Sequence, residues 1–561
     1  MKTPNIILLS AILATVLTSC SGKLGSLSSD YFKVNPNPLE AEAGHVEATI
    51  NGLFPEKYMQ KKAVVTVTPE LRFEKDGAVQ TVKGQPATFQ GEKVLGNDQI
   101  VNYRMGGQYT MRTRFAYEPA MQKSDLWLTF DARLGNKAVE VPAVKVAEGV
   151  VATSELYHQT LLTAQPSMAT DAFQRVVAQK QEANIKFLIQ QAELRKGELK
   201  NNSVQEFVSL LQRISADRDR LNLRSVEVSA YASPDGGFEL NERLANKRQE
   251  NTEQYVKDQL RKADLSSDVE TSYTAQDWEG FQQLVQASSI QDKDVILRVL
   301  SMYKDPQERE QQIKNMSYGF RELADGILPE LRRARLTINY ETVGRSDEEI
   351  MAQLRNDASK LSVEELLYAA AKSQDAADKQ QIYQTTTRLY PADVRAYNNL
   401  AAMAYAGGRY DEARQLLEKA RGVSGGSAEV SSNLGLMALL QGDTQGAEAL
   451  MAKGVQATNS AEALGNLHLA QGNYARAEQD FGDICSNSAA LAQIQNKNYA
   501  KAARTLRGIS RPDGMTDYLQ AVLNARQGNR EAAAAFLQAA LQKDASLRPY
   551  AERDKEMDAI R

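Results

Sequence analysis

The sequence predicts a multidomain protein with three parts: an N-terminal antiparallel β domain over about 41–165, an α/β domain over about 170–345, and an all-α solenoid of helical repeats over about 361–561. Three observations predict this organisation. Apolar residues alternate with a period of two in the first part, strand-like and helix-like segments alternate in the second, and a small-residue pattern recurs in the third. A length of 561 residues fits several domains, because one hydrophobic core rarely serves more than about 250–300 residues.

The first 40 residues are typical of a targeting segment followed by a linker. Lys2 is followed by an apolar run from Ile6 to Leu17, which is too short to span a bilayer. The run ends in Leu17-Thr18-Ser19-Cys20, which resembles the lipobox of bacterial lipoproteins. This resemblance implies a signal peptide over 1–19, lipidation of Cys20 and a lipidated linker over 20–40. The alternative is an ordinary secretory signal peptide with a chance cysteine.

Strand and turn signals predict the β domain, most simply as a sandwich. The β-branched run 63–68 ends at Pro69, and the large apolar residues Tyr109, Met111, Phe115 and Tyr117 recur at even spacing. A turn pair, Gly135-Asn136, separates two further strand-like segments. No catalytic motif occurs in this part, so we expect it to be structural or adhesive.

Strand and helix signals alternate in the second part. Strands are expected near Ile185, Val226, Val269 and Leu336, with helices over about 204–214 and 239–262 and from about 277 onward. A helical insertion over about 289–328 precedes the last strand. This order predicts an α/β domain.

One segment of the α/β domain carries a binding motif. Tyr231, Gly236, Asn241, Leu244, Arg248 and Tyr255 have the spacing of the peptidoglycan-binding domain of OmpA-like proteins, which the segment resembles. The resemblance implies that Arg248 binds the carboxylate of diaminopimelate, while an aspartate binds its ammonium group. Ser233 occupies the aspartate position, and Asp235 is the nearest substitute. The candidate peptidoglycan site is therefore Ser233, Asp235, Asn241 and Arg248. The alternative is that Arg248 only braces its helix against the neighbouring strand.

The C-terminal part repeats itself. The small residues Ala413, Ala447, Ala477, Ala502 and Ala533 recur at intervals of 34, 30, 25 and 31, and glycine turns such as Gly442-Asp443 and Gly472-Asn473 precede them. This pattern resembles the tetratricopeptide (TPR) repeat, whose period is about 34. Small residues let paired helices approach closely, and the stacked pairs form a curved solenoid. The 25-residue interval predicts a shortened helix pair near 482–502.

The TPR resemblance implies a groove that binds protein or peptide ligands. By repeat register, the candidate groove residues are Asn398, Ala402, Tyr405, Ser432, Leu436, Glu462 and Asn466. The alternative is that these residues merely complete a solenoid that serves as a spacer.

Composition and missing motifs argue against several functions. The net charge is −4, which gives no sign of a nucleic-acid partner. The three histidines lie far apart and the cysteines are Cys20 and Cys485, so we expect no metal and no cofactor. Cys485 is expected to be a small buried residue. A Gly-rich phosphate loop, a G-x-S-x-G elbow and an H-E-x-x-H helix are all absent from the sequence, so we expect no enzyme.

Together these features resemble the multidomain outer-membrane lipoproteins of Bacteroidota. The resemblance implies a scaffold that is anchored in the outer membrane through Cys20 and binds envelope proteins and peptidoglycan. No acidic residue occurs over 21–29, which favours the periplasmic side of that membrane. The alternatives are a surface-exposed adhesin or fimbria-associated lipoprotein and, because carboxylates are plentiful, a cell-wall glycosidase.

Overall fold

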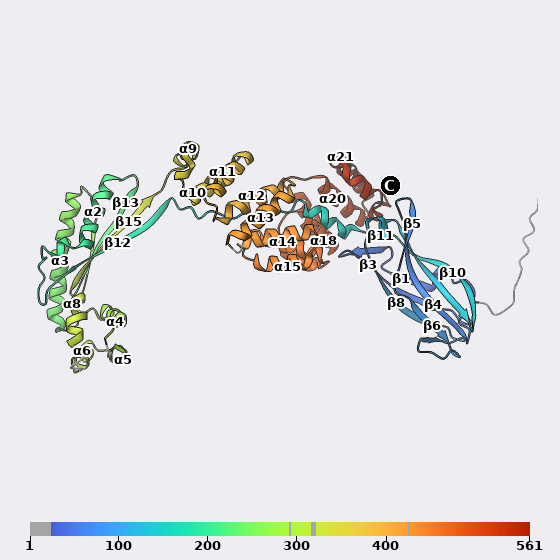
Figure 1. Ribbon diagram of the computed structural model, residues 1–561, viewed down its shortest axis with the longest axis horizontal. Helices are drawn as coiled ribbons and strands as arrows, with labels where there is room; N and C mark the ends of the chain where they lie inside the picture. Colours follow the sequence, from blue (N-terminus) through green and yellow to red (C-terminus); the bar gives the residue numbers. More distant parts are fainter. Residues whose placement is uncertain (1–23, 291–292, 316–320, 425–426, 561) are drawn as a thin grey trace, which may run out of the picture. The chain divides into compact units, whose positions relative to one another are not determined.

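The protein is described by a computed structural model that covers residues 24–290, 293–315, 321–424 and 427–560 (Figure 1). It divides into two compact units. One unit combines the described residues up to Thr170 with those from Ser373 onward, and the other is Asp171–Lys372. The predicted fold class is confirmed: β sheets come first, a mixed α/β part follows, and paired helices end the chain. The α/β part is thus inserted in sequence between the two halves of the first unit.

The described part of the β domain consists of two sheets that share one core. Strands alternate buried and exposed residues, because successive side chains point to opposite faces. The first sheet contains β1 (Phe32–Asn35), β3 (His45–Phe54), β2 (Leu39–Glu42), β11 (Val150–Val151) and β8 (Gly107–Ala116). The second contains β10 (Lys137–Glu148), β9 (Ser124–Leu134), β4 (Ala63–Lys75), β6 (Ala87–Gly91), β7 (Gln99–Val101) and β5 (Ala78–Lys83).

The β domain begins earlier than the sequence indicates. Leu24, Leu27 and Phe32 are buried in its core, and both β1 and β2 lie within the stretch assigned to a linker. These strands are only four residues long, too short for a period-two pattern to mark them. Residues from 24 onward therefore belong to the folded domain. Cys20 lies outside the described residues.

The α/β domain contains a four-stranded sheet in the order β12-β15-β13-β14. Its strands are β12 (Val176–Lys186), β15 (Arg333–Val343), β13 (Leu221–Tyr231) and β14 (Val269–Thr274). Only the β13–β14 pair is parallel among these described strands. Two helices, α2 (Asn202–Ala216) and α3 (Phe238–Lys262), bury apolar side chains in the same core as the sheet. The insertion forms a separate small core from α4 (Trp278–Ala287), α5 (Lys293–Met302), α6 (Pro306–Asn315) and α8 (Leu328–Leu331).

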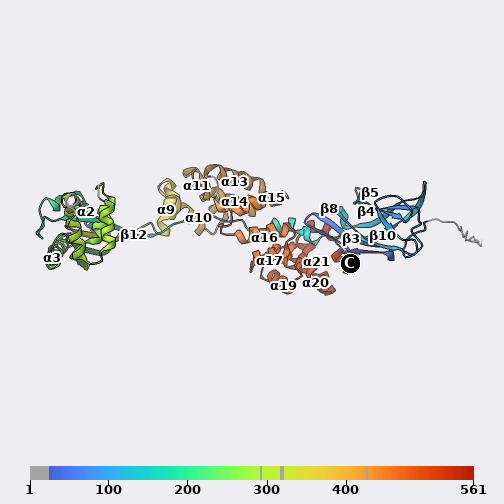
Figure 2. The same cartoon turned by 90° about the horizontal axis from the view of Figure 1, so that it is seen from below.

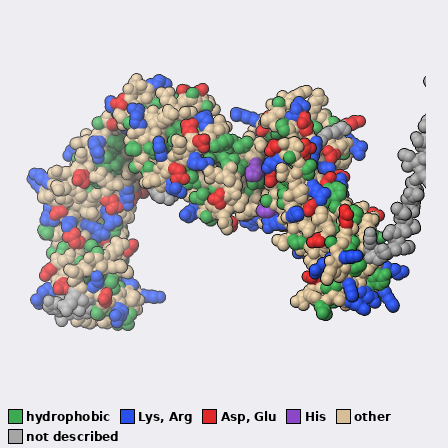
Figure 3. All heavy atoms as spheres, turned by 45° about the vertical axis from the view of Figure 1, so that its right-hand side comes forward, with side chains coloured by type: hydrophobic (Ala, Val, Ile, Leu, Met, Phe, Trp, Pro, Cys, Tyr) green, Lys and Arg blue, Asp and Glu red, His purple; other side chains and the backbone are tan. Residues whose placement is uncertain are grey.

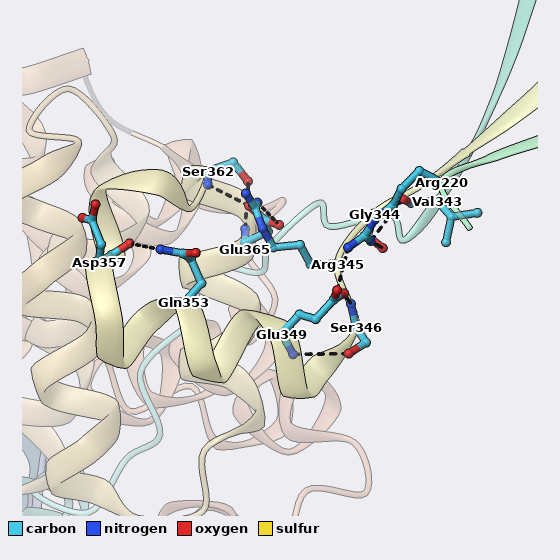
Figure 4. A network of polar contacts seen from close by, with 10 residues as sticks. All are labelled: Arg220, Val343, Gly344, Arg345, Ser346, Glu349, Gln353, Asp357, Ser362 and Glu365. Atoms are coloured by element: carbon cyan, nitrogen blue, oxygen red, sulfur yellow. Dashed lines mark hydrogen bonds and ion pairs between the residues drawn. The ribbon is translucent and has the colours of Figure 1, made fainter. Parts of the chain in front are cut away.

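A polar junction fixes α9 (Asp347–Asp357) and α10 (Val363–Lys372) to the ends of the strands (Figure 4). Arg220, next to β13, donates to the Gly344 carbonyl at 2.6 Å and to Glu349 Oε1 at 2.6 Å. Glu349 also forms a capping box with Ser346 at the start of α9. Arg345 then pairs with Glu365 of α10 at 2.9 Å, so both helices are tied to the sheet.

The C-terminal helices pair in the TPR manner. The described pairs are α12 (Val394–Ala406) with α13 (Tyr410–Ser424), α14 (Ala428–Leu440) with α15 (Thr444–Lys453), α16 (Ser460–Ala470) with α17 (Tyr474–Phe481), α18 (Asn487–Gln495) with α19 (Tyr499–Gly508), and α20 (Gly514–Arg526) with α21 (Arg530–Lys543). The five aligned alanines are all fully buried. The shortened pair falls at α18–α19. A single helix, α11 (Ala376–Leu389), precedes α12.

The helices that the structure describes include none that is both long and apolar enough to cross a membrane.

The expectation of a buried Cys485 is wrong. Its side chain is exposed in the loop between α17 and α18, where its thiol faces the Asp483 carbonyl.

Candidate functional site

The TPR repeats hold a segment of their own chain. Residues 152–170 follow β11 and include the short helix α1 (Tyr157–Leu161), which packs against α14, α16 and α18, the first helices of successive repeats. Figures 1 and 2 both show this teal segment among the orange and red helices. Its contacts begin near the C-terminus, where Tyr550 Oη donates to the Ala152 carbonyl, and end at α12. We call residues 152–170 the groove segment.

Two asparagines clasp the backbone of the groove segment. Asn433 Oδ1 accepts from the Ser167 amide at 2.7 Å, and its Nδ2 donates to the Ser167 carbonyl at 2.8 Å. Asn399 makes the same pair of bonds with Ala169, at 2.7 and 2.9 Å. Ser167 and Ala169 are separated by a single residue. The segment is therefore extended here, with alternate residues facing the repeats. A side-chain amide satisfies both backbone groups as a β-strand neighbour does.

The groove segment is also held by other polar and apolar contacts. Tyr405 Oη donates to the Leu161 carbonyl at 2.7 Å, and Glu462 Oε1 accepts from the Gln165 amide at 3.1 Å. Leu161 and Ala164 belong to the hydrophobic core of the repeats. The contacts therefore combine backbone recognition with burial of apolar side chains, and the buried backbone groups of Ser167 and Ala169 keep hydrogen-bond partners.

Burial shifts the ionisation of the groove residues. Desolvation raises the pKa of Glu462 above its ordinary value, against the hydrogen bonds from Gln165 and Asn459, which lower it. Desolvation likewise raises the pKa of Tyr405. Both groups are thus biased toward their neutral forms.

The predicted groove residues fall into two groups. Asn398, Tyr405 and Glu462 form hydrogen bonds to the groove segment, and Leu436 shares a core with Leu161. Ala402, Ser432 and Asn466 are buried too, but Asn466 donates to the Glu462 carbonyl of its own helix. In the structure, the chain itself occupies this groove with residues 152–170.

The residues that grip the backbone most fully were missed at the sequence level. Asn399 and Asn433 lie 34 residues apart, one full repeat, at the position next to the predicted Asn398 and Ser432. Two asparagines at equivalent buried positions were the available signal. Asn459, which donates to the Gln165 carbonyl at 2.6 Å, lies in a connection between repeats and had no such signal.

A second candidate site is a small pocket in the α/β domain, lined by the four predicted residues and by Arg332. Ser233 Oγ donates to the Asp235 carboxylate, and Arg332 binds both of them, at 3.1 Å to Ser233 Oγ and 3.0 Å to Asp235 Oδ2. Asn241 Nδ2 donates to the carbonyls of Ser233 and Gly236 and so shapes the loop. The structure brings Ser233, Asp235, Asn241 and Arg248 together, and it adds a second guanidinium that the sequence did not single out.

Arg248 serves mainly as a brace. Only 1% of the residue is exposed, and its guanidinium donates to the carbonyls of Gln191, Tyr231 and Leu188 at 3.0, 2.9 and 3.3 Å. It also lies over the ring of Phe187. Burial, followed by the nearby Arg332, lowers the pKa of Arg248 to about 10. These contacts agree with the bracing interpretation and use three of the five N–H donors of the guanidinium.

Among the residues that the structure describes, no group of three or more His, Cys, Asp or Glu side chains is arranged to hold a metal ion.

Comparison with known proteins identifies the repeats. TPR family sequences match residues 394–423 and 428–453. Similar solved structures include a TPR protein from Parabacteroides merdae (15% identity, 44% of this chain and 97% of that one, TM-score 0.28). They also include Pseudomonas aeruginosa PilF (14%, 38% and 96%, 0.26) and yeast Tom70 (11%, 65% and 83%, 0.24). No curated protein matches the chain. The family matches identify the C-terminal helices as TPR repeats, a kind of repeat that indicates protein–protein interaction.

Proposed function

We propose that the protein is a lipid-anchored scaffold of the outer membrane, facing the periplasm, that binds envelope proteins through its TPR repeats and peptidoglycan through its α/β domain. It has no catalytic role in this proposal. The observation that carries the proposal is the clasp of an extended peptide by Asn399 and Asn433. The same side chains bind any extended backbone, because they recognise amide and carbonyl groups rather than a particular side chain.

Because the groove is occupied, another protein can bind there only by displacing the groove segment. A tethered ligand acts at a high effective concentration, on the order of millimolar for a short flexible connection. A partner must therefore present an extended strand that outcompetes the groove segment, or use another face of the repeats. While the groove segment stays bound, the repeats hold the stretch of chain that connects the β domain to the α/β domain in the sequence.

The wall-binding part of the proposal rests on the charges of the pocket. Arg248 and Arg332 supply two guanidinium groups and Asp235 one carboxylate, so the pocket suits a zwitterionic ligand with an excess of carboxylate. Diaminopimelate in a stem peptide has this chemistry. The Asp235–Arg332 pair must open or share its charges for such a ligand to bind.

A peptide-binding experiment tests the groove. Residues 160–169 are replaced by a Gly/Ser linker of equal length, and a labelled peptide of residues 152–170 is titrated into this variant and into the unmodified chain. We expect saturable binding to the linker variant and much weaker binding to the unmodified chain. Adding Asn433→Ala to the linker variant should weaken binding, whereas Asn136→Ala, on a β turn, should not. No binding to the folded linker variant would overturn the proposal for the groove.

Co-sedimentation with purified sacculi tests the pocket. Asp235→Asn and Arg332→Ala should each reduce binding, while Arg243→Ala, an exposed arginine of α3, should leave it unchanged. Equal binding of sacculi by all four proteins would exclude this pocket as the peptidoglycan site.

Fractionation of cells that carry Cys20→Ala tests the anchor separately. We expect the variant protein to leave the envelope fraction, and its retention after a high-salt wash would contradict lipid anchoring.

A further inference from the structure

One end of the β domain gathers four connections of the chain. They are residues 55–62 between β3 and β4, 91–98 between β6 and β7, 102–106 between β7 and β8, and 135–137 at the β9–β10 turn. Hydrogen bonds join them: the Lys57 amide donates to the Tyr103 carbonyl at 2.6 Å, the Lys93 amide to Lys61 at 2.7 Å, and the Gly135 amide to Lys62 at 3.0 Å. We call these four connections the tip.

The tip exposes large apolar side chains. Leu95 is fully exposed, Met105 is 77% exposed, and Ile100, on β7 between the two loops that carry them, is 60% exposed. An Asx turn holds the 102–106 loop, because Asn102 Oδ1 accepts from the amides of Arg104 and Met105 at 2.9 and 3.0 Å. Met105 is therefore presented to solvent by a defined loop. Exposed apolar side chains that cluster in this way mark a contact surface.

Basic side chains surround these apolar residues. The tip carries six basic residues, Lys57, Lys61, Lys62, Lys93, Arg104 and Lys137, against three acidic ones, Glu56, Glu92 and Asp98. All six basic residues are exposed, and no salt bridge to them occurs among the residues that the structure describes. Figure 3 shows Lys and Arg side chains gathered at this end of the β domain. The whole chain is acidic, so this local excess of +3 is a distinct feature.

The start of the described chain lies at the same end. Tyr58, in the tip, donates to the Gly25 carbonyl at 3.0 Å, and Leu24 and Leu27 are buried in the β-domain core. In the sequence, Cys20 precedes Leu24 by four positions. A lipid on Cys20 would hold the tip at the membrane surface.

We infer that the tip is a membrane-contact surface for anionic phospholipid headgroups. Leu95, Ile100 and Met105 enter the boundary between headgroups and acyl chains, and the lysines and Arg104 bind the headgroup phosphates. Apolar insertion combined with cationic attraction is the usual basis of interfacial binding. This inference rests on the proposed lipid anchor, since the anchor brings the tip to the membrane. It adds that the protein part itself binds lipid and so holds the β domain in a fixed orientation.

Vesicle co-sedimentation of a chain without lipid tests the inference. The chain from residue 20 with Cys20→Ala is mixed with vesicles of phosphatidylcholine alone or with phosphatidylglycerol. We expect binding to the anionic vesicles that weakens as salt is raised, because screening shortens the range of the attraction. The variant Lys57→Gln, Lys61→Gln, Lys62→Gln should bind on the order of a hundredfold more weakly, if each lysine contributes about 1 kcal/mol. The variant Leu95→Ser, Met105→Ser should also lose binding.

Matched variants control for charge, polarity and folding. Lys196→Gln, Lys200→Gln, Lys262→Gln makes the same charge change on exposed lysines of the α/β domain, and Val79→Ser makes the same apolar-to-polar change at an exposed strand position. Both controls should bind as the parent does. Absence of binding by the parent chain, or equal loss in tip and control variants, would overturn the inference. Since no lipid is attached in this assay, its outcome is independent of whether Cys20→Ala releases the protein from cells.

Discussion

Asn433 on α14 donates through Nδ2 to Asn398 Oδ1 on α12 at 2.9 Å, and both side chains are almost completely buried. The bond joins neighbouring repeats, and Asn398 Nδ2 donates in turn to the Ser167 carbonyl at 2.9 Å. The packing of the two repeats and the capture of the groove segment therefore depend on one hydrogen-bond network. Such networks couple their members, so changes within them should not be additive.

Removing a clasp should open the groove segment locally. Asn433→Ala leaves the Ser167 amide without its acceptor and should cost about 2–4 kcal/mol, because three hydrogen bonds are lost and buried polar groups remain. Hydrogen exchange at Ser167 and its neighbours measures this directly. The matched control is Asn466→Ala, which removes a buried asparagine bonded only to its own helix. If both variants accelerate exchange over 163–170 equally, the clasp does not hold the segment.

Glu462 should make stability depend on pH. Burial raises its folded pKa above the ordinary value of 4.5, so the folded state binds more protons than the unfolded state between those two values. The contribution of Glu462 to the free energy of folding is therefore most favourable at pH 4.5 and below, and it becomes less favourable as the pH rises through the folded pKa. We expect the melting temperature of the protein, minus that of Glu462→Gln, to fall from pH 4.5 to pH 7.5. A difference that is constant or rises with pH would contradict the assignment.

Two equivalent glycines should respond differently to alanine. A Cβ on Gly465 would lie 2.7 Å from the ring of Phe481, which is buried and rigid, whereas on Gly435 it would meet the flexible side chain of Met451. Gly465→Ala should destabilise the repeats by about 1–3 kcal/mol. Gly435→Ala should destabilise the repeats less, because Met451 can change rotamer and an improved helix propensity of about 1 kcal/mol offsets part of that adjustment. Chemical denaturation followed by circular dichroism distinguishes them, and equal effects would refute the packing argument.

Arg248 should contribute to the stability of the α/β domain as well as to ligand binding in its pocket. Arg248→Ala leaves the carbonyls of Gln191, Tyr231 and Leu188 without their donor and should cost about 3 kcal/mol or more. Arg243→Ala, exposed on the same helix, should change stability by less than about 0.5 kcal/mol. Thermal unfolding of the two variants checks this. A small effect of Arg248→Ala would mean that its three backbone bonds contribute little. Loss of wall binding by this variant alone therefore says nothing about the pocket, and Arg332→Ala is the informative change.

Local patterns in the sequence determined most of the architecture. The recurrence of Ala413, Ala447 and Ala477 fixes the helix pairs, because only small side chains allow that close crossing. The alternation of buried residues along β8 similarly follows from strand geometry. Register within the repeat also located Asn398, Tyr405 and Glu462 on the ligand-facing side. These features depend on residues close together in the chain.

Only the tertiary structure decided what fills the groove and what Arg248 binds. Asn433 and Ser167 are 266 residues apart, and Arg248 and Gln191 are 57 apart, so no local pattern links either pair. The apolar residues of the groove segment follow no regular period that would mark it as a ligand. The α/β domain separates the groove segment from the repeats in the sequence, yet both belong to one compact unit, so only long-range contacts show that they meet.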